Sequence, residues 1–156
     1  MTDSTISRPR RGEVWLVALG AAREGEIGKT RPAVVVSVDG LQAGTPYDRI
    51  TVVPLTASAR QRPNMIQPRV PAGQGLEHDS VVLCDAPRAI LVSRFVRRLG
   101  TVSDEVFGQI IQARCLVEGW DDVRFGSGLE PFDDEEDAAD FASGASRSLT
   151  PRRIDD

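Results

Sequence analysis

At 156 residues the chain has the length of one domain, and because only 5% of it is aromatic its core must consist mostly of Val, Leu, Ile and Ala. No apolar run approaches the roughly 20 residues that span a bilayer, and the arginine-containing start lacks the apolar segment of a signal peptide. Cys84 and Cys115 stand in apolar surroundings, which predicts two small buried residues of a reduced, cytoplasmic protein; one bridge between them is the alternative.

The net charge of −4 is unevenly distributed along the chain. Residues 1–120 carry 15 basic and 12 acidic side chains, whereas residues 121–156 carry 4 basic and 11 acidic ones. Almost all the positive charge of the first part is arginine, since Lys29 is the only lysine. Arginine suits bidentate phosphate contacts, so the acidity of the whole chain does not exclude a nucleic-acid partner.

The chain begins with a polar arm, residues 1–11, which we expect to be disordered. Short apolar runs bounded by turn residues then predict a series of strands. The predicted strands span residues 12–19, 31–38, 49–56, 65–70, 80–85, 88–92 and 97–102. Pro54 in the third of them indicates a sheet edge or a bulge. Residues 20–30 form a loop with three glycines, long enough to indicate a functional or mobile segment.

After the strands the apolar spacing changes to that of a helix, which we predict over 104–118. Ser103 is a suitable N-cap and Gly119 a suitable C′ residue. Many short strands and one terminal helix indicate a mainly β protein, a strongly bent sheet or barrel closed by a helix. We therefore divide the chain into the arm, a barrel domain over residues 12–119 and an acidic tail over 120–156 that is too polar to fold alone.

The sequence offers few side chains for the commoner catalytic chemistries. His78 is the only histidine, and two cysteines 31 residues apart are no zinc motif, so we expect no metal and no cofactor. A hydrolase triad would need His78, whose setting between acids is typical of a surface turn. The segment Gly25–Thr30 has a GK-T pattern, but its spacing is short and a strand follows it.

Arginine, threonine and glutamate at predicted strand ends fit one remaining reaction, the cleavage of RNA by its own 2′-hydroxyl. That reaction needs a proton acceptor, a proton donor and positive charge on the phosphorane. Arg31 can hold the phosphate charge, Thr56 can donate to a non-bridging oxygen, and Glu26 can take or relay a proton. Taken singly, each has a plainer interpretation: a solvated loop arginine, a turn-capping threonine and a solvated loop acid.

Four blocks in this order resemble the MazF/PemK family of toxin endoribonucleases of type II toxin–antitoxin systems, over about residues 12–117. The blocks are Gly25-Glu26 with Arg31-Pro32-Ala33-Val34-Val35-Val36, Val52-Val53-Pro54-Leu55-Thr56, Gly75-Leu76 with Asp79-Ser80-Val81-Val82-Leu83, and Arg88. The resemblance implies an SH3-like barrel of the CcdB/MazF type with a C-terminal helix. It implies a homodimer, a cognate antitoxin and metal-independent cleavage of single-stranded RNA to 2′,3′-cyclic phosphate and 5′-hydroxyl ends.

Carried over residue by residue, the resemblance implies that Arg31, Thr56 and Glu26 are catalytic. The side chains expected to bind RNA are Lys29, Ser58, Arg60, Arg62 and Arg88. The chain departs from the family where Asp85-Ala86-Pro87-Arg88-Ala89 replaces a run with Gln and Thr, which affects the expected RNA sequence preference.

Two other functions fit the same fold. One is a toxin similar to CcdB that poisons gyrase, which would leave Arg31 and Thr56 unexplained. The other is a barrel that binds RNA without cutting it. The tail adds a further hypothesis: its aromatic residues among acids, Trp120 to Phe141, resemble an antitoxin peptide and would fold back over the arginines, whereas a solvated acidic tail is the plainer interpretation.

Overall fold

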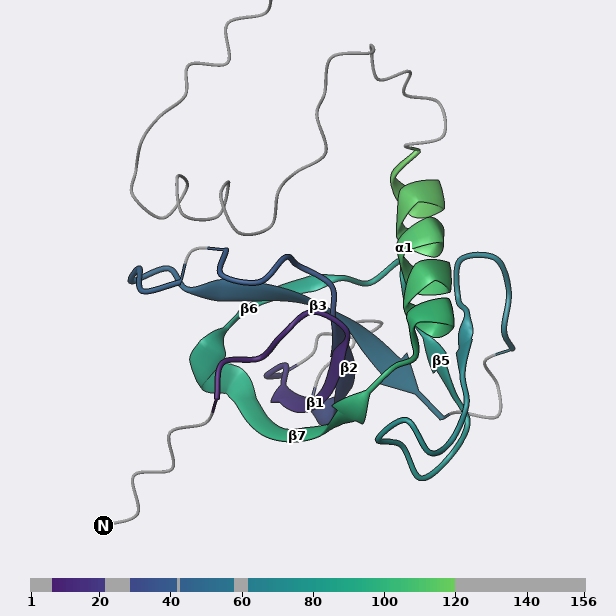
Figure 1. Cartoon of the computed structure of the whole chain (residues 1–156), viewed down its shortest axis with the longest axis horizontal. Helices are drawn as coiled ribbons and strands as arrows, with labels where there is room; N and C mark the ends of the chain where they lie inside the picture. Colours follow the sequence, from purple (N-terminus) through teal and green to yellow (C-terminus); the bar gives the residue numbers. More distant parts are fainter. Residues whose placement is uncertain (1–6, 22–28, 42, 58–61, 120–156) are drawn as a thin grey trace, which may run out of the picture.

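The computed structural model describes residues 7–21, 29–41, 43–57 and 62–119, which form a mainly β domain with a C-terminal helix (Figure 1). The elements, in order, are β1 (Glu13–Ala18), β2 (Thr30–Val35), β3 (Arg49–Thr56), β4 (Arg69–Val70), β5 (Ser80–Val82), β6 (Arg88–Leu91), the 3-10 helix η1 (Val92–Arg94), β7 (Phe95–Thr101) and α1 (Asp104–Glu118). The predicted fold class is therefore confirmed. Among the described residues, no helix has both the length and the apolarity to cross a bilayer.

Antiparallel pairing bends the sheet into a small barrel. The central strand β2 pairs with β1 and β3, β1 also pairs with β7, and β3 also pairs with β6. The chain passes from β6 through η1 directly into β7, and Figure 1 shows this segment curling around β1 and β2. This single turn thereby connects the partner strand of β3 to the partner strand of β1.

Strand β3 changes partners along its length. Its first half pairs with β6, up to Val52 opposite Arg88, and its end pairs with β5, from Leu55 opposite Val82. Pro54 lies at this change, where its missing N–H leaves no gap in either ladder, while its carbonyl accepts from Leu83 N at 2.8 Å. Pro54 thus marks a switch between two partner strands, whereas the sequence had suggested an edge or bulge.

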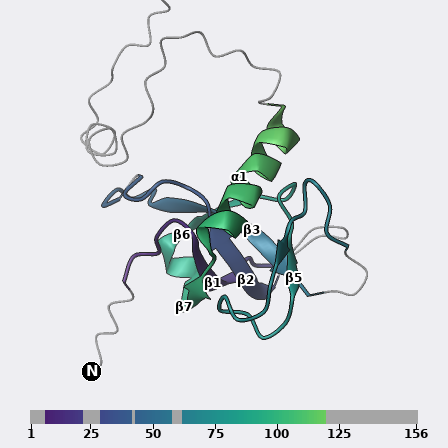
Figure 2. The ribbon, with the colours of Figure 1, turned by 45° about the vertical axis from the view of Figure 1, so that its right-hand side comes forward.

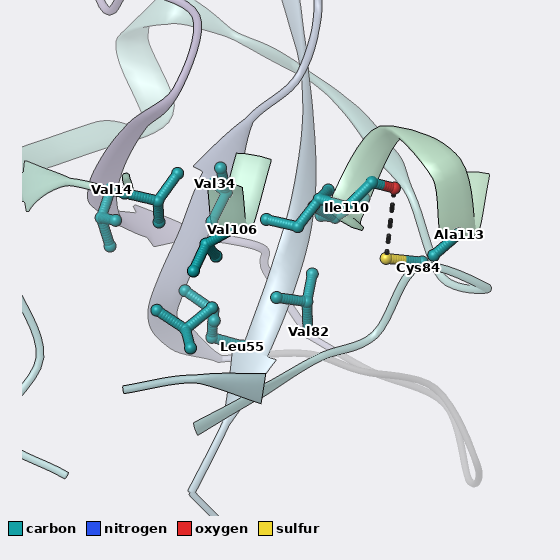
Figure 3. Close-up of a cluster of buried hydrophobic side chains, with 11 residues drawn as sticks. Val14, Val34, Leu55, Val82, Cys84, Val106, Ile110 and Ala113 are labelled. Carbon is teal, nitrogen blue, oxygen red and sulfur yellow. Dashed lines mark hydrogen bonds between the residues drawn. The ribbon is translucent and has the colours of Figure 1, made fainter. Parts of the chain in front are cut away.

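Both faces of the central strands are buried because apolar residues follow one another without alternation. The inner core of the barrel contains Trp15, Val17, Ala33, Val35, Ile50, Val52, Ile90 and Phe95. Trp15 and Phe95 meet edge to face, with ring centroids 5.7 Å apart. The outer core lies between the opposite face, β5 and α1, and Figure 3 shows Val106, Ile110 and Ala113 of α1 facing it.

The helix begins and ends where the sequence predicts. The Ser103 hydroxyl accepts from Val106 N at 3.3 Å, which caps the first turn. Gly119 adopts a left-handed conformation at φ 71°, and its N–H donates to the last-turn carbonyls of Cys115 and Leu116. Figure 2 shows α1 and β5 next to each other on the outer side of the bent sheet.

The described part of the N-terminal arm, residues 7–11, lies against the domain, contrary to the expected disorder. Arg8 forms an ion pair with Asp48 and donates to the Leu41 carbonyl at 3.1 Å. Arg11 donates to the Val36 carbonyl at 2.9 Å. Its guanidinium also lies 5.0 Å from the centre of the Phe107 ring, which belongs to α1. These arginines have partners far along the chain, which local composition does not reveal.

Several predicted strands differ in extent: β2 ends at Val35 instead of Val38, and β5 ends at Val82 instead of Asp85. The segment 65–70 is mostly turn, closed by reciprocal hydrogen bonds of 3.1 Å between Asn64 and Gln67, and only Arg69–Val70 pairs as β4. Strand β7 begins at Phe95, which is buried, whereas the sequence suggested a connecting loop there. Both cysteines are free thiols, so the alternative of a bridge between Cys84 and Cys115 is wrong. The tail, residues 120–156, lies outside the described part of the chain.

Candidate active site at the ends of β2 and β3

The loop between β1 and β2 is closed at its base by two backbone hydrogen bonds. Leu19 N donates to the Lys29 carbonyl at 2.9 Å, and Lys29 N donates to the Gly20 carbonyl at 2.8 Å. Both ends of the loop turn through positive φ, 85° at Gly20 and 66° at Lys29, which is uncommon for a residue with a Cβ. This base places the exposed Lys29 two residues before Arg31.

Arg31 and Thr56 lie at the same end of the adjacent strands β2 and β3, just beyond the last pair of their ladder. The ladder pairs Val35 with Val52 and Ala33 with Pro54. The last pair of this ladder is Ala33 with Pro54, and two further residues along each strand in the same register lead to Arg31 and Thr56. Facing residues of an antiparallel ladder have Cα atoms about 4.5–5.5 Å apart, so a continuation of this register would bring both side chains to the same small volume. Both residues are half-buried.

Arg31 and Thr56 share a strand face with the inner core. Side chains two residues apart lie on one face, and Ala33 and Val35 of β2 are both inner-core residues. On the other side Arg31 pairs with Val17 of β1, which is fully buried. The guanidinium therefore stands at the end of an apolar barrel, where reduced solvent strengthens its attraction to an anion relative to bulk water.

Arg88 stands on the same side but farther along the strands. It begins β6 and pairs with Val52, four residues before Thr56 on β3. At about 3.3 Å per residue that separation is roughly 13 Å along the strand. Arg88, also half-buried, therefore flanks the Arg31–Thr56 pair instead of completing it.

Of the remaining predicted site residues, the structure describes Arg62 alone. Arg62 is exposed and follows the end of β3 by six residues. Glu26, Ser58 and Arg60 lie outside the described residues. Within the described ranges, no group of three or more His, Cys, Asp or Glu side chains is arranged to hold a metal ion.

A pocket that the sequence did not suggest opens on the outer face of the same strands. Its volume is about 560 Å³, and its lining includes Leu16, Pro32, Ala57, His78 and Arg97. The strand register unites these residues, since β1 places Leu16 beside Pro32 on one side and beside Arg97 on the other. Only a correct pairing of β1 with β7, 80 residues later in the chain, would have revealed this pocket from sequence.

Comparison with known proteins agrees with the fold. Residues 10–117 match the family model described as PemK-like, MazF-like toxin of type II toxin–antitoxin system. The chain is 38% identical over 111 residues to Endoribonuclease MazF9 of Mycobacterium tuberculosis, covering 69% of this chain and 93% of that protein. It is 28% identical over 106 residues to Endoribonuclease PemK of Escherichia coli, covering 65% and 75%.

Solved structures share the fold. A mycobacterial endoribonuclease in complex with its cognate antitoxin superposes with a TM-score of 0.58 at 19% identity, over 76% of this chain and 99% of that one. MazF of Deinococcus radiodurans gives 0.57 at 24% identity, over 72% and 97%. Because the family model covers more than half of the chain, this protein belongs to the PemK-like, MazF-like family of type II toxin–antitoxin toxins.

Proposed function

We propose that this chain is a sequence-specific endoribonuclease toxin that cleaves single-stranded RNA, including mRNA, without a metal ion. The observation that supports the proposal is that Arg31 and Thr56 lie at the same end of the adjacent strands β2 and β3, on the face of the inner core. Two curated relatives, MazF9 and PemK, are named endoribonucleases, which supports the same reaction class. The products are a 2′,3′-cyclic phosphate and a 5′-hydroxyl.

In the proposed reaction, the ribose 2′-oxygen forms a bond to the adjacent phosphorus and the bond from phosphorus to the 5′-oxygen breaks. The 2′-hydroxyl gives its proton to a base, which we assign to Glu26, and the 5′-oxygen receives a proton as it leaves. Arg31 donates two hydrogen bonds to the phosphorane and acts as the acid that protonates the leaving 5′-oxygen. Thr56 donates a hydrogen bond from its hydroxyl to a non-bridging oxygen. Lys29, Ser58, Arg60, Arg62 and Arg88 hold the flanking phosphates and bases.

We further propose that the chain acts in the cytoplasm as a homodimer and is neutralised by a cognate antitoxin. The solved mycobacterial endoribonuclease, which is in complex with its cognate antitoxin, supports the last point. The family model favours the nuclease over the gyrase-poisoning alternative, on which the Arg31–Thr56 pair has no role. The cleavage experiment below distinguishes the nuclease from the remaining alternative, a barrel that binds RNA without cutting it.

The test is incubation of the purified protein with a long single-stranded RNA in EDTA, followed by primer-extension mapping of the new ends. We expect discrete cuts with 5′-hydroxyl termini, and a rate at least about 100-fold lower for Arg31→Ala. Arg49→Ala is the matched control, because Arg49 is an exposed arginine at the other end of β3, beside Tyr47. Binding without discrete cuts, or equal cutting by Arg31→Ala, would overturn the proposal.

A further inference from the structure

The outer-face pocket has an apolar floor formed by the strands that carry the candidate active site. Leu16 and Pro32 face each other across β1 and β2, and both are only partly buried. They continue the outer core beyond the part covered by α1, since they share a strand face with Val14 and Val34, which belong to that core. The floor therefore offers a flat apolar surface that the helix leaves uncovered.

The opposite wall of the pocket is the turn before β5, which includes Gly75, Glu77 and His78. A close backbone contact between Gly75 and Gly100 holds this turn against β7. Leu76 of the same turn packs against the outer core. The buried Ser80 hydroxyl donates to the His78 carbonyl at 3.1 Å and holds the end of the turn. The His78 and Glu77 side chains are exposed at the rim of the pocket.

The polar groups around the floor suit one kind of ligand. Unpaired RNA bases stack on aromatic rings, including imidazole, and on the guanidinium plane of arginine. His78 and Arg97 supply an imidazole and a guanidinium here. The Glu77 carboxylate accepts hydrogen bonds only, so it would take the amino group of a base. A volume of about 560 Å³ is in the range of small-ligand sites and holds one flat heteroaromatic group with its ribose.

The pocket lies at the same strand ends as the candidate active site. Pro32 follows Arg31 on β2, and Ala57 follows Thr56 at the end of β3. Successive residues of a strand point to opposite faces, so the catalytic pair and the pocket lie back to back at the same strand ends. An RNA strand that crosses these ends presents a phosphate to one face and an unstacked base to the other.

We propose that this pocket binds one unpaired base of the substrate RNA next to the cleaved position and thereby sets part of the cleavage sequence. His78 and Arg97 stack on the base, Leu16 and Pro32 contact its face, and Glu77 accepts from its edge. The inference rests on the proposed function, because the ligand is a nucleotide of the same RNA. His78 and Arg97 are specificity residues here, not catalytic ones.

The test measures kcat/KM on RNAs that carry each of the four bases at each position around the mapped cut. His78→Ala and Arg97→Ala should each lower the preference at one shared position about tenfold, with little change at the others. Arg97→Lys should not restore the preference, because an ammonium has no plane on which a base can stack. Arg49→Ala serves as the control for loss of one exposed positive charge.

Unchanged base preferences in both variants, or an equal loss on every RNA, would overturn the inference while leaving the nuclease intact. If the wild type cuts no RNA, the proposed function fails separately, and fluorescence anisotropy with the same RNA panel still measures base preference in binding. Loss of antitoxin binding in the two variants, with base preference intact, would assign the pocket to the protein partner and also overturn the inference.

Discussion

Gly75 and Gly100 meet backbone to backbone, so that a Cβ on Gly75 would lie 2.7 Å from the Gly100 nitrogen and one on Gly100 would lie 2.7 Å from the Gly75 Cα. Gly75 also has a φ of 87°, which side-chain-bearing residues rarely adopt. The contact joins the turn before β5 to strand β7 and so completes the outer-face pocket. Neither glycine has a side chain that could make way for the other.

Gly100→Ala is expected to destabilise the domain by about 1–3 kcal/mol, because the added methyl meets backbone that cannot rotate away. Urea unfolding monitored by Trp15 fluorescence is one way to measure this change. Gly108→Ala is the matched control: Gly108 lies within α1 with nothing within 4 Å of an added Cβ, so alanine should stabilise by roughly 0.5–1 kcal/mol. A neutral Gly100→Ala would contradict the close contact.

The Asp79 carboxylate should make stability depend on pH at the acid end. A hydrogen bond from Ala72 N at 2.9 Å and an ion pair with Arg69 lower the pKa of Asp79 below its usual 3.8. The unfolded chain therefore takes up this proton first, so the contribution is present above about pH 4 and is lost as the pH falls through the lowered pKa.

Asp79→Asn should remove this part of the pH dependence, as measured by urea midpoints between pH 6 and pH 2. Arg69→Ala should remove less of it, because the backbone donor at Ala72 is the larger cause of the lowered pKa. The same acid dependence in wild type and Asp79→Asn would show that the carboxylate does not hold the turn in the folded protein.

The two cysteines should differ in reactivity. Cys84 is fully buried, and burial raises the pKa of its thiol from 9.0 to about 12 although the Arg114 charge opposes the shift. The thiolate is the reactive form, so at pH 8 Cys84 should react with a disulfide reagent at least about 100-fold more slowly in the folded protein than in urea. The variant Cys115→Ala isolates this thiol, and equal rates in both states would contradict its burial.

The same pKa shift has a consequence at high pH. The unfolded thiol loses its proton near pH 9, whereas the folded one keeps it until about 12. Unfolding thus releases a proton in this range, so the stability contributed by Cys84 is complete below pH 9 and declines above it. This decline should appear in urea midpoints of the wild type between pH 8.5 and 10.5.

Local signals were sufficient to predict much of the fold. The bounds of β3 and α1 agree with the predictions, because β-branched runs, the Ser103 cap and the Gly119 terminus act within a few residues.

What sequence did not reveal depends on long-range pairing. Arg8 finds Asp48, 40 residues away, and Phe95 packs on Trp15, 80 residues before it. A central strand accommodates Pro54 only because β3 changes its partner strand at that residue. No local sequence rule predicts such a change. The outer-face pocket likewise requires the register between β1 and β7.

Thr56 should contribute through its hydroxyl alone. Thr56→Ser keeps the donor and should retain most of the cleavage rate, whereas Thr56→Val keeps the shape and should lose about 10²-fold or more. Because Arg31 and Thr56 act on one phosphate, the losses in Arg31→Ala and Thr56→Val should not add in the double variant. Equal rates for Thr56→Ser and Thr56→Val would remove Thr56 from the reaction.

The single-turnover cleavage rate of one mapped RNA site by wild type, Arg31→Ala and Arg49→Ala tests the central claim most directly. All three proteins are purified in parallel and assayed in EDTA, and their folding is verified by circular dichroism. The account predicts a wild-type rate for Arg49→Ala and a loss of at least about 100-fold for Arg31→Ala. Equal rates for Arg31→Ala and wild type would contradict it.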